Sequence, residues 1–295
     1  MAELLQRSPA GIAVDHRFRC LSCGGPEYQA VLDDVPDRLM RLSGRFSYGK
    51  CARCNLVQIR EVPADLGQYY AGYGRHSKES RAYAFFRRVV TGRCYSFPRG
   101  LGRRLLDVGS GNGWYLQAMT RRGWVATGYE LDAAHANDLS RQIGLPVMSE
   151  LQQLKRDSDR FDLATFNFSL EHLAQPRQTL EAVSDALKPG GQVIIVVPNF
   201  QSREARIFGR KWFHLDAPRH ITFYSKDQLA KLLTETGFKD VQFTDIPVAT
   251  GFAGSLSYLI FGYLHPLVWY PAILPGMLFS LLVRDGNFRV SAVKA

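Results

Sequence analysis

Residues 105–113 read Leu-Leu-Asp-Val-Gly-Ser-Gly-Asn-Gly, and this stretch decides the fold of the chain. It joins an apolar strand pattern to a helix pattern through a glycine-rich turn. Glycines let the backbone turn tightly and approach a ligand, and the start of the following helix offers free N–H groups to an anion. A second apolar run ends at Glu130, about 20 residues further on, where a carboxylate can accept ribose hydroxyls. The stretch therefore predicts a nucleotide-type cofactor loop.

Two details of this loop favour a methyl donor over NAD. The glycine spacing is G-x-G-x-G rather than G-x-G-x-x-G, and Asp107 stands two residues before the first glycine. A carboxylate there would repel a pyrophosphate, but it suits the ammonium group of S-adenosylmethionine. The carboxylate of the same molecule suits the helix end. A structural loop and a dinucleotide enzyme remain the alternatives.

The composition sets the broad class of the protein. A chain of 295 residues can hold one large domain and a small module. Its net charge of +10 favours an anionic partner, which could be nucleic acid, an acidic bilayer surface or a phosphorylated substrate. The first residues lack the apolar run of a secretory signal, so we expect a cytoplasmic protein. In that compartment the five cysteines are not expected to form a disulfide framework.

Four of the cysteines form two C-x-x-C pairs, at Cys20, Cys23, Cys51 and Cys54. Two such pairs supply four thiolates, which suits a tetrahedral zinc ion. Gly24 and Asn55, which follow the second cysteine of each pair, tolerate the positive φ that folds N–H groups around sulfur. Four thiolates leave no position open for water, so the predicted zinc is structural. The alternative is four ordinary buried cysteines, and lone Cys94 is expected to be a small buried side chain.

From residue 104 onward, strand patterns alternate with helix patterns. Strands are predicted over 104–108, 125–130, 146–148, 161–167 and 192–197, with helices near 114–122, 133–143 and 177–187. This alternation implies a parallel sheet with helices on both faces and ligands at the carboxyl ends of its strands. A helix over 225–236 and an antiparallel strand pair over 241–246 and 287–293 complete the prediction.

Further motifs occur in a fixed order along this region. They are D-V-G-S-G at 107–111, Glu130, F-D-L at 161–163, L-E-H-L at 170–173, L-K-P-G-G at 187–191 and V-P-N at 197–199. With them, the chain from about residue 104 to 295 resembles class I S-adenosylmethionine-dependent methyltransferases. The zinc module ahead of it and W-F-H-L-D-A-P-R-H at 212–220 resemble a bacterial subgroup that acts on sugars, nucleotide sugars or lipid-linked glycans.

This resemblance implies an α/β, Rossmann-like fold with a seven-stranded sheet. The implied organisation is a zinc-binding module over 1–68, a linker and helix covering the active site over 69–103, and the methyltransferase domain over 104–295. The helix is expected over 77–95, and its aromatic side chains either close over the ligand or pack on the domain. These side chains are Tyr83, Phe85, Phe86 and Tyr95.

The resemblance also implies the residues that hold the cofactor. Asp107 and the glycine loop would hold its methionine part, Glu130 its ribose, and Leu131 its adenine. Ser149 would reach the adenine edge, and Asn167 would line the floor under the sulfonium. The implied cofactor residues are Asp107, Gly109, Ser110, Gly111, Gly113, Glu130, Leu131, Ser149 and Asn167.

Methyl transfer to an alcohol needs a base for the hydroxyl proton, and histidine suits this role. His172 follows the fourth strand, and His220 follows the fifth strand with Asp216 placed to orient it. Arg219 is the candidate to bind an anionic group of the acceptor. The alternatives are backbone bonding for His172 and an internal ion pair between Asp216 and Arg219. For His214 core packing is expected.

The stretch from Ile246 to Val283 contains no Asp, Glu, Lys or Arg, which predicts an apolar helical insertion over about 250–284. Prolines at 266, 271 and 275 break it into pieces too short to cross a bilayer as one helix. A hairpin lying on an anionic membrane surface fits this pattern, and so does a lid or homodimer interface. Either a peripheral position on the inner face of the cell membrane or a protein contact is therefore expected.

These observations favour O-methylation of a sugar, a glycan or a lipid-linked intermediate. The fourth strand lacks the N/D-P-P-Y/F pattern of base-amine methyltransferases. Sugar C-methyltransferases of the subgroup that the chain resembles usually carry a further carboxyl-terminal domain, and none is expected here. An RNA-modifying methyltransferase that grips phosphates with its zinc module and basic surface is an alternative. The cysteine region lacks a dense run of basic residues, which ranks nucleic acid lower. A cofactor-binding protein without transfer activity is the third possibility.

Overall fold

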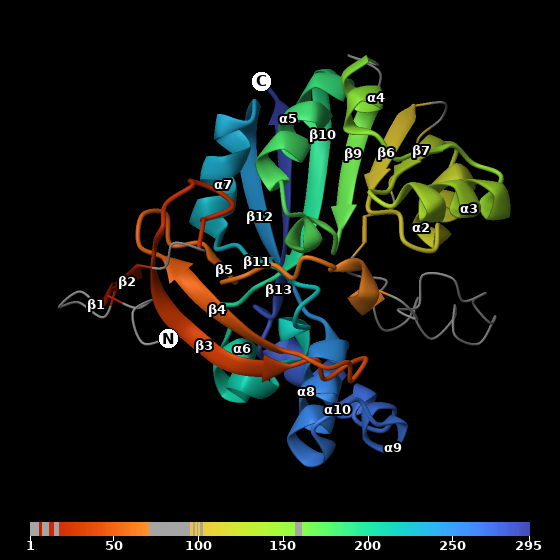
Figure 1. The fold of residues 1–295 in the computed structure, drawn as a ribbon. Coiled ribbons are helices and arrows are strands. Elements are labelled where there is room, and N and C mark those ends of the chain that lie inside the picture. The colour runs from red at the N-terminus through yellow and green to blue at the C-terminus, as the bar shows by residue number, and fades with distance from the viewer. Residues whose placement is uncertain are drawn as a thin grey trace.

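The computed structural model describes residues 6–7, 12–14, 18–70, 95–96, 98, 100, 103–156 and 161–295 (Figure 1). The expected helix over 77–95 lies outside them except for Tyr95, and so does Cys94. Within the described residues the chain forms two sheets, one of six strands and one of seven.

The seven-stranded sheet has the order β12-β13-β10-β9-β6-β7-β8. Its strands are β6 (Arg104–Val108), β7 (Val125–Tyr129), β8 (Val147–Met148), β9 (Phe161–Asn167), β10 (Leu187–Pro198), β12 (Phe238–Ile246) and β13 (Asn287–Lys294). The five strands from β10 to β8 pair in parallel, and β13 pairs antiparallel with both β10 and β12. The predicted Rossmann-like α/β fold is confirmed. The strand order changes direction at β6, which is where such sheets bind ligands.

Helices cover both faces of this sheet, as Figure 1 shows. They are α2 (Trp114–Thr120), α3 (Ala133–Ile143), α4 (Leu151–Arg156), α5 (Pro176–Ala186) and α7 (Lys226–Glu235). Local signals fix α3: the Asp132 side chain accepts from the N–H groups of Ala134 and His135, and Gly144 ends the helix at φ 68°. Ser225 and Gln228 form a capping box at the start of α7.

The main core lies between the sheet and these helices. Leu106, Phe166, Val193 and Leu233 are fully buried in it. Each such side chain contributes about 1.5–3 kcal/mol to folding through removal of apolar surface from water. The core therefore fixes the strand ends at which the candidate site lies.

The N-terminal sheet takes one of its strands from the C-terminal half of the chain. Its order is β1 (Gln6–Arg7), β2 (Ile12–Val14), β3 (Glu27–Pro36), β4 (Arg45–Cys51), β5 (Val57–Ile59) and β11 (Thr222–Phe223). Strand β11 pairs antiparallel with β5, through Thr222 opposite Gln58. The cysteine-bearing segment is therefore joined by hydrogen bonds to the residues that closely follow His220.

The uncharged stretch forms the predicted helical insertion. Its helices are α8 (Ala249–Phe261), α9 (Pro266–Trp269) and α10 (Ile273–Leu282), and α6 (Arg203–Phe208) packs beside them. In Figure 1 they project below the seven-stranded sheet, beyond the ends of β12 and β13. Within the described residues, none of the helices has the length and apolar character needed to cross a bilayer.

Candidate functional site

A cavity of about 320 Å³ lies at the carboxyl ends of β6 and β7. The residues that define its walls include Gly109, Gly111, Glu130, Leu131, Phe168 and His172. This is the crevice that the strand order predicts, and the glycine loop forms one side of it.

The glycine loop has the backbone that its sequence requires. Gly109, Gly111 and Gly113 have φ values of 77°, 57° and 73°, in the left-handed region that favours glycine. A side chain at Gly109 would collide with Ser169, which follows β9. The Gly111 N–H donates to Oε1 of Glu130 at 2.5 Å, so the loop is closed onto the end of β7.

Asp107 places a carboxyl group near the end of β6, directly before the glycine loop. It is buried, and its carboxylate accepts from Thr165 Oγ1 at 2.7 Å and from Asn167 Nδ2 at 3.1 Å. Burial raises the pKa of Asp107 to about 7, and the negative charge of Glu130 also raises it. Within the described part of the chain, Asp107 forms no ion pair. Two acids at the same strand ends suit a ligand that carries positive charge.

The other predicted cofactor residues lie around this acid. Ser110 donates through Oγ to the Asp107 carbonyl oxygen, and Asn167 holds the Asp107 carboxylate, so both lie beneath the cavity rather than in its wall. Gly113 precedes α2, and Leu131 is exposed at the cavity mouth. Ser149 is half-buried beyond β8 and does not line the cavity.

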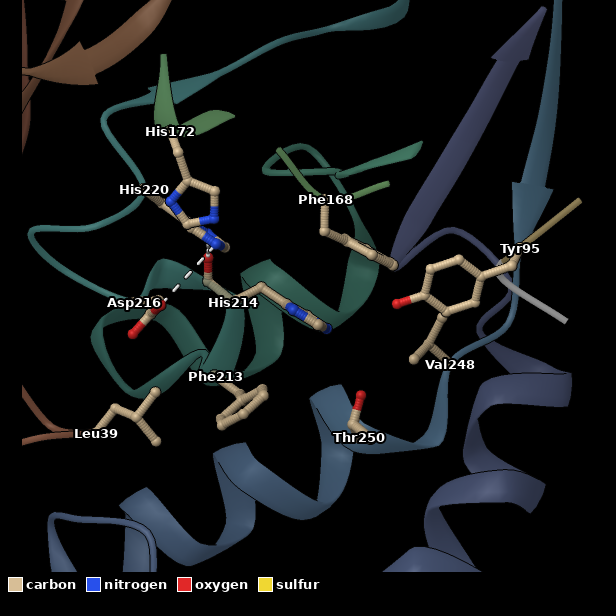
Figure 2. Close-up of a pocket in the computed structure, with 10 residues that line it drawn as sticks. All are labelled: Leu39, Tyr95, Phe168, His172, Phe213, His214, Asp216, His220, Val248 and Thr250. Carbon is tan, nitrogen blue, oxygen red and sulfur yellow. Dashed lines mark hydrogen bonds and ion pairs between the residues drawn. The ribbon is translucent and has the colours of Figure 1, made fainter. Parts of the chain in front are cut away.

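A second cavity of about 210 Å³ adjoins the first (Figure 2). Phe168 and His172 line both cavities. The remaining walls of the second cavity are Leu39, Tyr95, Phe213, His214, Asp216, His220, Val248 and Thr250. Because two side chains are shared, a group in the second cavity lies next to a ligand in the first.

The two candidate bases stand together in this second cavity. The ring centroids of His172 and His220 are 4.6 Å apart, and the rings are arranged edge to face. Figure 2 labels both side chains in the wall of the cavity. His172 Nδ1 is 2.8 Å from the Arg219 carbonyl oxygen, and His220 Nδ1 is 2.7 Å from the His214 carbonyl oxygen. A carbonyl only accepts, so each Nδ1 carries the proton, and the Tyr70 hydroxyl oxygen 3.0 Å from His172 Nδ1 then accepts from the same N–H. Each Nε2 is then a lone-pair acceptor. Burial lowers the pKa of His220 well below 6.5, which keeps this ring neutral at pH 7.

Glu171 is not among the predicted site residues, although the L-E-H-L motif contains it. It is buried, its Oε1 is 3.8 Å from His220 Nε2, and neither of its oxygens has a hydrogen-bond partner among the described residues. Burial raises its pKa to about 8. Glu171, His172 and His220 place one ligand-type atom each within 4.8 Å of one another.

Arg219 is enclosed in the protein rather than presented to the cavity. Its guanidinium is bonded to Asp37 at 2.7 Å and to Asp216 at 2.6 Å, and it also donates to the Tyr69 carbonyl oxygen. This geometry fits the internal ion pair, and we do not retain Arg219 as a residue that binds an acceptor. Asp216 has its second oxygen 4.0 Å from His220 Nε2. Asp37 carries no local sequence signal for this contact.

His214 is buried beside Trp212 and Phe213, and burial lowers its pKa to about 4. It also lines the second cavity. Tyr95, the described member of the predicted aromatic group, lines the same cavity and packs edge to face on Trp114.

The four predicted zinc ligands converge at one end of the N-terminal sheet. Cys20 Sγ is 3.4 Å from Cys54 Sγ, and Cys23 Sγ is 3.5 Å from Cys51 Sγ. All four sulfurs lie within 4.8 Å of one another. Thiolates about 2.3 Å from a tetrahedral zinc ion are about 3.8 Å apart, so the cluster fits a zinc site with four cysteine ligands. Gly24 and Asn55 have φ values of 71° and 63°, as this turn type needs.

Comparison with known proteins agrees with this geometry. A crystal structure of an S-adenosylmethionine-dependent methyltransferase from Archaeoglobus fulgidus aligns with a TM-score of 0.50 and 19% sequence identity. The alignment covers 77% of this chain and all of that one, so the class I methyltransferase fold is shared. Residues 56–243 match the family described as the methyltransferase domain. The chain belongs to that methyltransferase family.

Two curated relatives are similar over part of their length. A protein from Alkalilimnicola ehrlichii named ubiquinone biosynthesis O-methyltransferase is 33% identical over 105 residues, which is 33% of this chain and 42% of the relative. A protein of the same name from Idiomarina loihiensis is 26% identical over 155 residues, or 48% of this chain and 63% of the relative. The matches thus span less than two thirds of either relative.

Proposed function

We propose that this chain transfers a methyl group from S-adenosylmethionine to a hydroxyl group of a small molecule. The single observation that carries this proposal is the contact between the two cavities. Phe168 and His172 line both, so a donor in the first cavity and an acceptor in the second would meet at these side chains.

The residues of the first cavity fit S-adenosylmethionine. The carboxylate of Asp107, buried directly before Val108 of the cavity wall, suits the ammonium group through its negative charge. Glu130 suits the ribose hydroxyls, and exposed Leu131 offers an apolar surface for adenine. When bound, the cofactor supplies a methyl group already activated by the positive sulfur. The protein then has mainly to align the acceptor, which contributes several kcal/mol through orientation alone.

The residues of the second cavity supply the base. His172 is the better candidate because its ring lines both cavities and its Nδ1–H is committed to the Arg219 carbonyl. Its Nε2 would take the hydroxyl proton as the oxygen–carbon bond forms and the sulfur–carbon bond breaks. The His220 ring packs against the His172 ring, and its own Nδ1 is bonded to the His214 carbonyl oxygen. We therefore assign His220 the role of holding the His172 ring in position for the proton transfer.

The acceptor hydroxyl most consistent with these walls belongs to a lipid-linked molecule. Apolar and aromatic side chains surround the histidines, including Phe168, Phe213 and Val248. The two relatives are named for O-methylation in ubiquinone biosynthesis, which supports a hydroxyl acceptor. Of the acceptors that the sequence leaves open, a lipid-linked intermediate fits this surface better than a free sugar or glycan.

The cofactor half of the proposal is tested by calorimetry with S-adenosylhomocysteine. Glu130→Ala should weaken its binding at least tenfold, since each bond from a charged group contributes about 1.5–3 kcal/mol. Glu181→Ala, on the exposed face of α5, is the matched control and should bind as the wild type does. A wild-type protein without measurable affinity contradicts the proposal.

The transfer half is tested with tritiated S-adenosylmethionine and a total lipid extract dispersed in detergent. The wild type should place label in alkali-stable ether linkages of the lipid fraction. His172→Ala should slow labelling by about 10²–10⁴-fold with the affinity for S-adenosylhomocysteine retained. Label in amines or carbon positions, or equal rates for the variant, would contradict this assignment.

A further inference from the structure

Most of the buried positions of the helical insertion carry small side chains, with Tyr258 and Ile273 as the large buried ones, and many of its large apolar side chains are exposed. On α8 the buried positions include Gly251, Ala253 and Gly254, and on α10 they include Gly276 and Ser280. The backbones approach so closely that a Cβ at Gly276 would lie 2.7 Å from the Ala249 carbonyl oxygen. A water-soluble helix pair normally buries its leucines and exposes its polar residues.

The outward face of this insertion is apolar. Leu274, Leu278 and Leu282 recur every four residues along α10, and the last two are 63% and 76% exposed. Leu267 on α9 is 78% exposed. Further exposed side chains of this outer apolar face are Leu259, Ile260, Phe261, Tyr270 and Leu281. A surface of this kind marks an interaction site rather than ordinary solvent exposure.

The rim of the outer apolar face carries positive charge. Arg41 lies over the Tyr263 ring at 4.5 Å, and Arg38 donates to the Gly262 carbonyl oxygen at 3.1 Å. Exposed Arg284 directly follows the insertion. The segment itself has no acidic residue from Ile246 to Val283. A basic rim around an apolar face is complementary to anionic headgroups above an acyl layer.

The helices are too short to cross that layer. Helix α8 has 13 residues and α10 has 10, which correspond to lengths of about 20 and 15 Å. The hydrocarbon core of a bilayer is about 30 Å thick. A segment of this length and composition enters only the near leaflet.

We propose that the outer apolar face docks this chain on the surface of an anionic phospholipid bilayer. The inner end of the same insertion forms part of the wall of the second cavity, to which the proposed function assigns the acceptor (the acceptor cavity). Val248 and Thr250 line this cavity, and Phe213 packs against Gly254 of α8. Docking therefore places the acceptor cavity next to the lipid phase. The role of this placement in methyl transfer rests on the proposed function, whereas the docking on a bilayer does not depend on it.

Flotation with vesicles tests the docking. The full chain should float with vesicles of equal phosphatidylcholine and phosphatidylglycerol, and should bind pure phosphatidylcholine at least tenfold less. Leu278→Glu, and more strongly the double variant Leu274→Glu/Leu278→Glu, should reduce flotation at least tenfold. Val125→Glu is the matched control, because Val125 is an exposed apolar residue at the start of β7, outside the insertion, and should leave flotation unchanged.

Any of three outcomes would overturn the proposal. The first is a wild-type protein that binds neither vesicle type, and the second is a double variant that floats as well as the wild type. The third is a stable dimer, detected by light scattering, that Leu278→Glu dissociates. In the last case a second copy of the chain covers the face. Calorimetry with S-adenosylhomocysteine on the same preparations shows that the variants are folded, and it separates a failure of docking from a failure of the proposed function.

Discussion

Asp107 shows how a single buried acid can prepare a site for a cationic ligand. Its two hydrogen bonds from Thr165 and Asn167 favour the ionised form, yet burial raises its pKa to about 7. The Asp107 carboxyl group is therefore only partly ionised at neutral pH. A bound ammonium group would supply the positive charge that stabilises the carboxylate.

We accordingly predict that the affinity for S-adenosylhomocysteine depends on pH. As pH falls through about 7, Asp107 takes up a proton and loses its attraction for the ligand ammonium. Affinity should drop on the order of fivefold between pH 8 and pH 6, which corresponds to about 1 kcal/mol of binding free energy. Calorimetry across this range measures it, and Asp107→Asn should give a weaker and nearly flat profile. A wild-type profile that is flat would rule out this role of Asp107.

Asp37 is a second single residue with a testable role, in this case in the stability of the folded protein. It holds the buried Arg219 guanidinium through two oxygens, together with Asp216. Asp37→Asn leaves the buried Arg219 cation with only one of its two carboxylate partners, Asp216. This should lower the free energy of unfolding by about 3 kcal/mol. Urea denaturation measures this loss.

Asp34→Asn is the matched control for that variant. Asp34 is an exposed residue of the nearby strand β3 that lies 3.4 Å from Arg45 and 4.0 Å from Arg210, and removal of an exposed ion pair costs at most about 1 kcal/mol. Equal losses for the two variants would contradict a special role of the Asp37 bridge.

At the scale of elements, the sequence predicts best where the signals are local. The bounds of β6, β9 and α3 agree with the prediction to the residue, because Asp132 and Gly144 cap α3 and apolar runs define the two strands. The six-residue helix α4 is not predicted, since so short a segment shows no periodicity. Strand β11 has two residues and pairs with β5 far away along the chain, so no local pattern could predict it.

The same limit applies to the candidate site. The glycine loop, Glu130 and His172 belong to contiguous motifs, and the structure brings them to one crevice. The Asp37–Arg219 contact joins residues 182 positions apart, so only the folded chain reveals it. Glu171 is visible in its motif, but the burial that isolates its carboxyl group depends on tertiary packing.

Helix α6 contains a buried acid whose titration should affect folding. Glu204 accepts from Trp212 Nε1 at 3.1 Å and packs against Gly251 of α8, and burial raises its pKa to about 7. The folded state therefore binds this proton more tightly than the unfolded state, in which a glutamate titrates near 4.5. The contribution of Glu204 is fully present below about pH 4.5 and is lost as pH rises through about 7.

Glu204→Gln should remove the loss of folding stability that accompanies ionisation of Glu204 at high pH. The variant keeps the oxygen that accepts from Trp212, and it should be more stable than the wild type at pH 8 by on the order of 1–3 kcal/mol. Little difference is expected at pH 5. Chemical denaturation at both pH values measures this, with Glu181→Gln as the exposed control. A difference that does not change with pH would contradict the titration of Glu204.

At the scale of the whole molecule, three parts of the chain meet at the second cavity. Leu39 comes from the N-terminal region, Phe168 directly follows β9 of the seven-stranded sheet, and Thr250 comes from the insertion. The N-terminal sheet reaches the candidate bases directly, because Tyr48 Oη donates to the His220 carbonyl oxygen at 3.0 Å. Strand β11, which follows His220, completes that same sheet. The cysteine-bearing sheet therefore acts as a support for the loop of His220.

This arrangement predicts what removal of the metal would do. The four-cysteine cluster ties the start of β5 to the rest of the N-terminal sheet, and β5 holds β11. The purified protein should contain one zinc ion per chain, and Cys51→Ser should lose it and unfold at lower urea concentration. Cys94→Ser should keep the zinc. Most of the wall of the first cavity, including the glycine loop and Glu130, comes from the methyltransferase sheet, and the N-terminal region contributes Leu66, Gly67 and Tyr70. The affinity of Cys51→Ser for S-adenosylhomocysteine should therefore remain within about threefold of the wild type. Methyl transfer should fall much further, since the support of His220 is lost. Metal analysis, denaturation and calorimetry on the two variants distinguish this outcome from a site in which the cysteines are merely buried, for which zinc would be absent from the wild type.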